Sequence, residues 1–464
     1  MGYERFRIET KPALNIFKVP PKFDVSAKKI RLAGMLLHEA FEFRFNKEVV
    51  LSRPCIYGVF EGRLGGFKPI KEKCVGCMRC VQEYPHIMTV KPSDDYKKIG
   101  DSYWTPDQVF TIMYESSTGR IPVKGMGYKG GFGGDGFDGM WTDMSEIVRP
   151  TRDGVYGREY ISTIVDIGRK PPSLEFHDPG PGDQPRTIQI PIPILFDHLP
   201  DNLATEGTRR AIGLAATRLN TLQISEPQTV NSNPGDMAQV PLLQESDLNT
   251  SLDAFRKSRM IEYDADKFSL IPSLRKANPN AIITARLALG ESSGERAAQL
   301  VRDGVDALHL YTDYHGMDYS STPQHISSAL KTVHTRLVKE GVRDQVTIIA
   351  SGGITLAEHV PKAIICGADL VALDTTLLVA LQAEFNGETR NRDNCKLKPR
   401  NIDHEWGAQR IVNLMASWHD QLIEILSAMG MRDVRRLRGD VGRSMLDSEL
   451  KEQAFEGIAW ATQN

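Results

Sequence analysis

The 464-residue chain has no apolar run near the eighteen residues that a membrane-spanning helix requires, so we expect no transmembrane segment. Neither sign of charge dominates, because 57 Lys and Arg against 59 Asp and Glu give a net charge of -2. This balance gives no reason to expect nucleic acid or an anionic membrane as a partner. The N-terminal segment MGYERFRIETKPALNIFKVPPKF lacks the apolar stretch of a signal peptide. We therefore expect a cytoplasmic protein.

Cysteine is scarce, with six residues in the chain, yet three of them (Cys74, Cys77 and Cys80) lie within seven positions. So few cysteines do not form a disulfide framework for a chain of this length. Their local density instead predicts a metal site in a reducing compartment.

The stretch 74-CVGCMRCVQEYP-85 follows the ferredoxin pattern C-x2-C-x2-C-x3-C-P, except that Tyr84 stands at the fourth cysteine and Pro85 is kept. It resembles a bacterial-type ferredoxin. In two-cluster ferredoxins the last cysteine of each run ligates the other cluster. The resemblance therefore implies that Cys55, nineteen residues before Cys74, joins Cys74, Cys77 and Cys80 around one [4Fe–4S] cluster.

Two other interpretations of the cysteines remain open. One is a zinc site, although C-x2-C-x2-C is tight for tetrahedral coordination. The other is a relic that binds no metal. Of the two remaining cysteines, Cys366 lies in the apolar stretch AEHVPKAIICG and is expected as a small buried hydrophobe. Cys395, in the polar stretch NRDNCKLKPR, is expected as a free thiol.

From about residue 187 short apolar strands alternate with helical stretches, which predicts a parallel sheet, either open or closed into a (β/α)8 TIM-type barrel. Before it, the glycine-rich text around GGFGGDG lacks the strand–helix context of a dinucleotide site, and its aromatic residues favour an ordered crossing. We expect an arm and helix (1–48), a ferredoxin-like α+β iron–sulfur domain (49–118), a connecting segment (119–186), the barrel (187–405) and a helical C-terminal segment (406–464).

The stretch 346-VTIIASGGITLAEHVPKAIICGADLVALDTTLL-378 predicts a phosphate site. In (β/α)8 barrels the loops after strands 7 and 8 commonly bind phosphate through backbone N–H groups, and glycine lets the backbone come close. The candidate residues are Gly352 and Gly353 on one side and Asp374, Thr375 and Thr376 on the other. The alternative is a tight turn that binds nothing.

Four segments occur in order: the cysteine run, GMWTDMSEIVRPTRDG…GREYIST, the SGGI/GAD pair, and WGAQRIVNLMASWHDQLIEILSAMGMRDVRRLRG. Together they resemble the FMN-binding synthase domain of the glutamate synthase family, in its stand-alone form with an N-terminal ferredoxin module. The resemblance covers roughly residues 50 to 445. It implies an FMN in the barrel mouth, held at the five phosphate-site residues, and a cluster that exchanges electrons with it.

The chain departs from the family where the substrate would bind. The family text P-M-S-F-G-A-L-S is replaced by PILFDHLPDNLA, and GEGG by Ser225-Glu226-Pro227-Gln228. Arg286 stands where the family has a catalytic lysine, and the loop YTDYHGMDYSS offers Asp313 and His315. As candidate catalytic residues, Arg286 would anchor a substrate carboxylate and the other two would move protons. Their alternatives are a structural ion pair and ordinary polar positions.

Two functions follow from the resemblance. The first is an FMN- and iron–sulfur-dependent oxidoreductase acting on a small polar amino- or keto-acid-like substrate. The second is an electron-transfer or scaffold subunit of a larger redox complex, with a degenerate substrate pocket. A nucleotide-processing barrel like inosinate dehydrogenase is a weaker third, because no cysteine occupies the required loop. Expected partners are a ferredoxin or an NAD(P)H-oxidising flavoprotein, together with a separate glutaminase subunit, since the chain starts Met-Gly without a nucleophilic cysteine.

Overall fold

The computed structural model describes residues 6–52, 55–62, 67–123, 136–142, 160–170, 186–227, 238–243, 258–265 and 271–446. The chain divides into two compact units. The barrel unit comprises residues 1–14, 112–120 and 133–464, and the cysteine unit comprises residues 15–111 and 121–132. The cysteine unit is therefore an insertion in the chain of the barrel unit. The expected boundary between residues 48 and 49 falls inside the cysteine unit.

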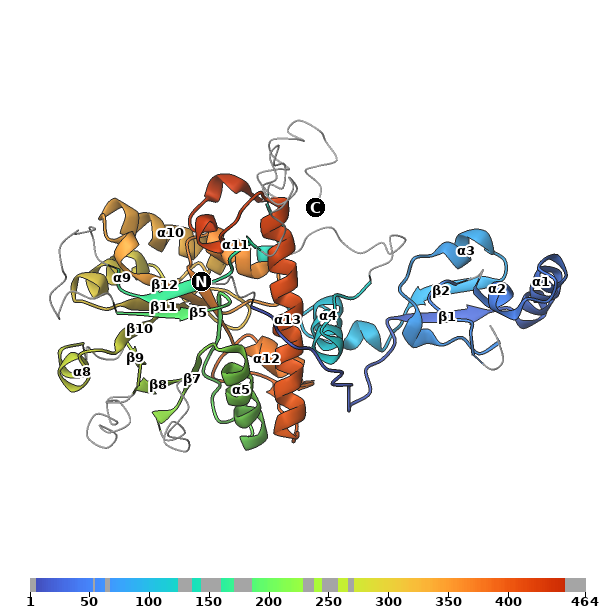
Figure 1. Cartoon of the computed structure of the whole chain (residues 1–464), viewed down its shortest axis with the longest axis horizontal. Helices are drawn as coiled ribbons and strands as arrows, with labels where there is room; N and C mark the ends of the chain where they lie inside the picture. Colours follow the sequence, from blue (N-terminus) through green and yellow to red (C-terminus); the bar gives the residue numbers. More distant parts are fainter. Residues whose placement is uncertain are drawn as a thin grey trace. The chain divides into compact units, whose positions relative to one another are not determined.

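Eight parallel strands form a closed barrel in the order β10-β11-β12-β13-β6-β7-β8-β9 (Figure 1). The closed (β/α)8 form of the predicted sheet is thus confirmed. The strands are β6 (Ile194–Phe196), β7 (Gln223–Ser225), β8 (Gln239–Leu243), β9 (Met260–Asp264), β10 (Ile282–Ala288), β11 (Ala307–Tyr311), β12 (Thr347–Ser351) and β13 (Leu370–Leu373).

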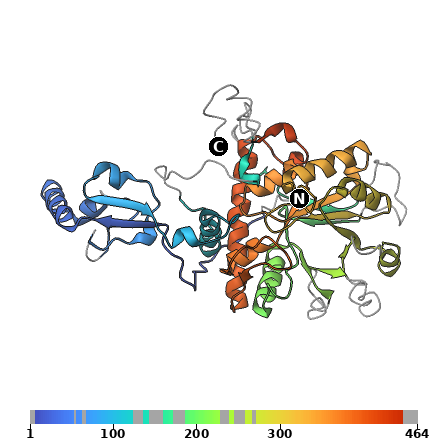
Figure 2. The ribbon, with the colours of Figure 1, turned by 180° about the vertical axis from the view of Figure 1, so that it is seen from behind.

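Helices follow the strands and cover the barrel. They are α5 (Glu206–Leu219), α8 (Ile271–Ala277), α9 (Ser293–Arg302), α10 (Ile326–Lys339), α11 (His359–Ile365) and α12 (Thr375–Ala380), with α13 (His404–Ala428) near the C-terminus. Helix α5 begins at Thr205, whose side chain accepts a hydrogen bond from the Thr208 N–H. Helices α5 and α13 lie side by side, as both views show (Figure 1 and Figure 2).

The expected first strand TIQIPIPIL is divided into two. Its first part, β5 (Thr187–Ile190), pairs with β4 (Val165–Gly168) in an antiparallel hairpin, and only β6 enters the barrel. The Gly168 N–H donates to the Thr347 hydroxyl at 3.0 Å, at the beginning of β12. The hairpin therefore lies at the amino ends of the barrel strands, opposite the end at which barrel enzymes bind ligands.

Much of the expected glycine-rich crossing, residues 124–135 and 143–159, lies outside the described residues. The described piece at 136–142 is ordered on the barrel. Phe137 is fully buried, and its carbonyl accepts a hydrogen bond from Lys362 Nζ at 2.7 Å. Asp138 pairs with His359 at 2.8 Å. The next residues form β3 (Met140–Thr142), which pairs with β16 (Ser444–Leu446). A further short pair joins β14 (Glu384–Phe385) and β15 (Leu397–Lys398).

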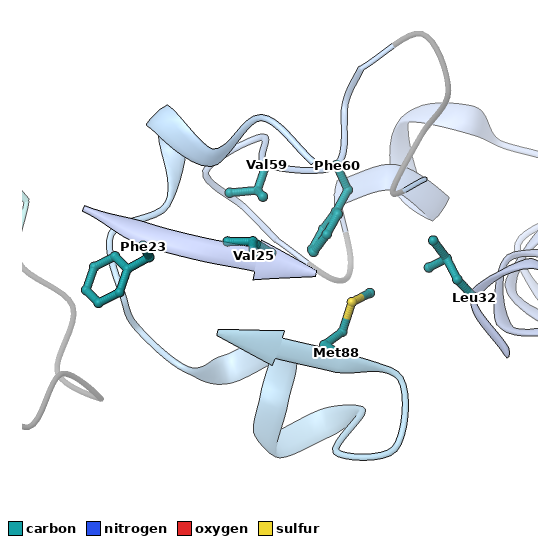
Figure 3. Packing of buried hydrophobic residues seen from close by; sticks show 6 residues of the cluster. All are labelled: Phe23, Val25, Leu32, Val59, Phe60 and Met88. Atoms are coloured by element: carbon teal, nitrogen blue, oxygen red, sulfur yellow. The ribbon is translucent and has the colours of Figure 1, made fainter. Parts of the chain in front are cut away.

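The cysteine unit is built on one antiparallel pair, β1 (Phe23–Ala27) and β2 (Met88–Pro92). Around it lie α1 (Lys29–Glu42), α2 (Lys47–Ser52) and α3 (Arg79–Glu83). Figure 3 shows the buried core between these elements, which consists of Phe23, Val25, Leu32, Val59, Phe60 and Met88. Helix α4 (Pro106–Thr118) follows this unit and ends within the barrel unit. Among the described residues, no helix combines the length and apolarity needed to span a membrane.

Helix α13 also holds the N-terminal arm against the barrel unit. Arg410 is fully buried and donates to three backbone carbonyls: Ala380 at 2.5 Å, Ala13 at 2.8 Å and Met113 at 3.3 Å. Burial lowers the pKa of this guanidinium to about 9. One side chain thus joins the arm, α4 and the end of α12.

We expect Arg410→Ala to lower the free energy of unfolding of the barrel unit by roughly 3 kcal/mol or more, because three buried carbonyls lose their donor. Urea unfolding followed by tryptophan fluorescence measures this change. The control is Arg210→Ala, which removes an exposed ion pair to Glu206 on α5 and should cost below about 1 kcal/mol. Equal losses in the two variants would contradict the role assigned to Arg410.

Candidate functional site

Polar side chains from five strands meet inside the barrel. Asp197 follows β6, Glu262 lies on β9, Arg286 on β10, His309 on β11, and Ser351 ends β12. All five are buried, with at most 8% of any residue exposed. Charged and polar residues in the interior of a barrel require partners, since burial of an uncompensated charge is costly.

Arg286 is the cation of this group. Its two terminal nitrogens donate to the two carboxylate oxygens of Asp197 at 2.6 and 3.0 Å. One of them also donates to Glu262 at 2.9 Å. Strand β6 stands opposite β10 in the closed strand order, so the bidentate pair crosses the barrel. The geometry is that of a planar guanidinium fork on a carboxylate.

His309 continues the network on the neighbouring strand. Its Nδ1 lies 3.0 Å from both carboxylate oxygens of Glu262, and its Nε2 lies 3.0 Å from the Ser351 hydroxyl. If Nδ1–H donates to the carboxylate, Nε2 is left to accept from the hydroxyl. The chain of contacts therefore runs without a gap from Asp197 to Ser351.

The electrostatics of the group follow from this pairing. Burial would raise the pKa of Asp197, but the charge of Arg286, helped by His309 and Arg392, outweighs it and holds the pKa below its usual value. Burial would lower the pKa of Arg286, yet Asp197 and Glu262 keep it well above its usual value. Both groups are therefore charged across the physiological range.

A second guanidinium enters the mouth of the barrel from the loop after α12. Arg392 donates to the Thr312 carbonyl at 2.6 Å and to Asp374 at 3.1 Å, and it lies 3.8 Å from Asp197. It also lies over the rings of Tyr314 and Tyr311, at 4.5 and 5.3 Å. Its side chain therefore links the ends of β13 and β6.

Three of the five expected phosphate-site residues, Asp374, Thr375 and Thr376, use polar groups for contacts within the protein. The Asp374 carboxylate accepts from the Thr375 N–H at 2.5 Å and from the Thr375 hydroxyl at 3.0 Å. The Thr376 hydroxyl donates to the Ile354 carbonyl. Burial raises the pKa of Asp374, and the charge of Arg392 opposes that rise. The donors on the Asp374 side of the expected site are thus engaged by the chain itself.

The glycines of this site have positive φ, +105° at Gly352 and +68° at Gly353. A Cβ on Gly352 would lie 2.1 Å from the Thr312 hydroxyl oxygen and 2.5 Å from the Asp313 carbonyl. Glycine is therefore required at 352 by the adjacent loop after β11, irrespective of any ligand.

These contacts test the fit of FMN. Its phosphate would meet the buried carboxylate of Asp374 at the position where it needs N–H donors. Asp374, Thr375 and Thr376 therefore do not fit the phosphate group, and we derive no chemistry through a flavin here.

A cavity of about 490 Å³ opens beside Arg392. Its lining consists of Ala288, Tyr311, Asp313, Tyr319, Arg390, Asn391, Arg392 and Asp393. Asp313 accepts from Arg390 Nε at 2.6 Å and from the His315 and Met317 N–H groups at 3.0 and 2.8 Å. The cavity therefore presents ion pairs to a ligand and not a charge of one sign.

The three predicted catalytic residues are not brought together as one set. Arg286 lies in the interior network and Asp313 lines the cavity. The buried His315 instead has its Nε2 3.1 Å from the Thr389 hydroxyl. In the expected substrate loop, Ser225 ends β7 and Glu226 lies 3.5 Å from His198, whereas Gln228 lies outside the described residues.

Sequence reasoning missed Asp197, Glu262, His309 and Arg392. The first three had a signal, since each is a polar residue inside or directly after a short apolar strand, in ILFDHL, MIEYD and ALHLY. Arg392 gave no such signal in the sequence, because it lies in a polar loop and its partners are distant in sequence.

In the cysteine unit the four predicted ligands lie near enough to act on one another electrostatically. Burial, together with the charges of Cys74, Cys55 and Cys77, raises the pKa of the Cys80 thiol to about 11. Burial likewise raises the pKa of Cys74, which accepts a backbone hydrogen bond from Gly76. The positive φ of Gly76 (+70°) and Met78 (+58°) turns the loop between the cysteines.

Zn–S bonds of about 2.3 Å bring sulfur atoms to within roughly 4 Å of one another. Among the described residues, the groups whose ligand atoms lie within 4.8 Å of one another include none of these cysteines, so no three of the thiols are gathered as they would be around a bound zinc ion. Thiolates are the ligands that hold iron–sulfur clusters. Tyr84 donates to Glu39 on α1 at 3.0 Å, so it has a partner within the unit.

Of the remaining cysteines, Cys366 is fully buried at the end of α11, as predicted, and burial raises its pKa to about 12. Cys395 is also buried and forms no disulfide.

Residues 250–432 match the family model described as the conserved region in glutamate synthase. This match, together with relatives that align over most of their length, supports a relationship between this chain and the glutamate synthase family. The archaeal-type glutamate synthase [NADPH] of Thermotoga maritima is 24% identical over 524 residues, covering 96% of this chain and 99% of the relative. The archaeal glutamate synthase [NADPH] of Archaeoglobus fulgidus is 23% identical, covering 88% and 94%.

Among solved structures, the flavin-binding domain of baker's yeast flavocytochrome b2 aligns with 68% of this chain and 78% of its own. The identity is 14% and the TM-score 0.45.

We expect Arg286→Met to destabilise the barrel unit by roughly 3–5 kcal/mol near neutral pH, because two buried carboxylates lose their cation. In the wild type, the depressed pKa of Asp197 contributes stability above its usual value, and that stability is lost as the pH falls. Without Arg286 the carboxylates should instead bind protons more readily. The deficit against wild type should therefore shrink as the pH falls from 8 towards 5.

Urea unfolding of both proteins across this range measures the deficit. Arg302→Met on α9, which removes an exposed pair with Glu340, is the control and should show little pH dependence. A deficit for Arg286→Met that stays constant with pH would contradict the assignment of a buried charge network.

Proposed function

We propose that this chain is the iron–sulfur electron-transfer subunit of a glutamate synthase-like oxidoreductase. The observation that carries the proposal is the convergence of four partly buried cysteines in one small unit, at ferredoxin-like spacing. Cys55, Cys74, Cys77 and Cys80 would hold one [4Fe–4S] cluster. Such a cluster supplies one-electron transfer when bound.

The residues around the thiols support this role. The buried core of the unit packs against Cys55, Cys74 and Cys80, which excludes water from one side of the ligands. Phe23 fixes the loop at Gly76, since a Cβ there would lie 2.4 Å from the phenyl ring. The partly buried thiols of Cys74 and Cys80, whose pKa values are raised, would release their protons on binding metal. The unit is thus built around the ligands.

The barrel supports the second of the two expected functions over the first. An FMN-dependent reaction within this chain rests on the family resemblance, whereas the described end of the barrel carries internal ion pairs at the expected phosphate site. The role of Arg286 as a substrate anchor is also weakened, because its donors are used by Asp197 and Glu262.

The surface of the cysteine unit supports the proposal that this chain binds a partner protein. Large apolar side chains are exposed along α1 and directly after it: Ile30, Leu37, Phe41 and Phe45. Exposed apolar stretches of this kind are typical of chains that assemble with others. The expected partner is an electron donor or acceptor, either a ferredoxin or an NAD(P)H-oxidising flavoprotein, with a separate glutaminase subunit as a further candidate.

We expect the anaerobically purified chain to contain about four iron atoms. Cys55→Ala should lose iron and the reduced-state EPR signal as completely as Cys77→Ala, because each removes one of four ligands. Cys395→Ala, which alters a buried cysteine of the barrel unit, is the matched control and should keep both. Full iron content with an unchanged EPR signal in Cys55→Ala would remove Cys55 from the ligand set.

A further inference from the structure

The loops after β12 and β13 are joined to each other and to the loop after α12 by their own side chains. Thr376 bonds the Ile354 carbonyl, and Arg392 bonds both Thr312 and Asp374. Asp374 is 2% exposed and Thr375 is 1% exposed. The polar side chains of Asp374, Thr376 and Arg392 are thus used within the protein, which distinguishes this side of the barrel mouth from an open anion site.

The charges also oppose a phosphate. A phosphate monoester carries close to two negative charges at neutral pH. At the Thr375 N–H it would displace one carboxylate oxygen of Asp374 and leave that buried carboxylate beside it. Arg392 is the nearest cation, but it already serves Asp374 and lies 3.8 Å from Asp197. One guanidinium would then face two carboxylates and a phosphate.

We infer that the Asp374–Arg392 pair excludes the phosphate of FMN from the barrel, so that this chain has lost the flavin of its family fold. Asp374 is the barrier, since its carboxylate takes the backbone donor at Thr375. Arg392 neutralises that carboxylate and thereby makes the closed arrangement stable. Any flavin in the working complex then belongs to another subunit. This inference deepens the proposed function, but it concerns a different unit of the chain.

The test uses the full chain, purified with its iron, and titrates it with FMN and with riboflavin. Bound flavin is measured by fluorescence quenching and by the flavin absorbance retained after desalting. The wild type should retain no flavin. Asp374→Gly frees the Thr375 N–H and Arg392, so it should bind FMN about tenfold or more tighter than the wild type. Riboflavin, which lacks the phosphate, should show no such gain.

Asp393→Asn is the matched control, because it removes a carboxylate from the lining of the same cavity without freeing Thr375. It should bind FMN as weakly as the wild type. Retention of about one FMN by the wild-type chain would overturn the inference. So would an Asp374→Gly variant that keeps its thermal unfolding transition yet binds FMN no better, or one that gains equally for riboflavin. Iron content is scored separately, so failure of the cluster assignment is distinguishable from failure here.

Discussion

The interior of the barrel depends on the bidentate pair between Arg286 and Asp197. The two residues come from strands on opposite sides of the closed sheet, so their contact fixes the barrel across its width and not only along neighbouring strands. Glu262, His309 and Ser351 attach to this pair in sequence. Without the guanidinium, two fully buried carboxylates would face each other in a region that water does not solvate. The remaining polar contacts are favourable only because the guanidinium of Arg286 balances the charge of the buried carboxylates.

The same balance determines what the barrel accepts. An interior that pairs its own acids with its own arginines has no net charge to offer a small anion. The glycine turn after β12 and the threonines after β13 keep the backbone of a phosphate-binding barrel, while the side chains around them form internal bonds. The cysteine unit differs from the barrel, because its polar groups suit an external ligand. Its four thiols are partly buried, and burial raises the pKa values of Cys74 and Cys80, an arrangement that metal binding relieves.

Sequence patterns predicted the parts of the fold whose signals are local. The strands β10 to β13 are apolar runs followed by glycine or a charged residue, which is a strong local signal. The strands β8 and β9 give weaker signals, because Pro241 interrupts β8 and the charged Glu262 interrupts β9. The division of TIQIPIPIL could not be foreseen, since one continuous apolar run serves two sheets.

The candidate sites divide in the same way. The four cysteine ligands stay a prediction, which rests on their spacing and on the ferredoxin resemblance. Gly352 and Gly353 lie on a positive-φ turn, but φ reports the backbone and not what lies beside it. Arg286 was predicted to anchor a substrate carboxylate, whereas its partners come from the end of β6 and from β9, which no local pattern connects to it. A pairing across a closed barrel is visible only once the barrel is built.

The insertion of the cysteine unit has a consequence for dissecting the protein. The arm before it is part of the barrel unit, because Asn413 exchanges hydrogen bonds with Lys11, and Arg410 bonds Ala13. An expression fragment that starts at the first barrel strand would therefore lack the arm residues that bond to α13. Asn413 and Arg410 would then lose the backbone acceptors at Lys11 and Ala13. A cleaner separation would keep residues 6–14 and replace the inserted unit with a short linker.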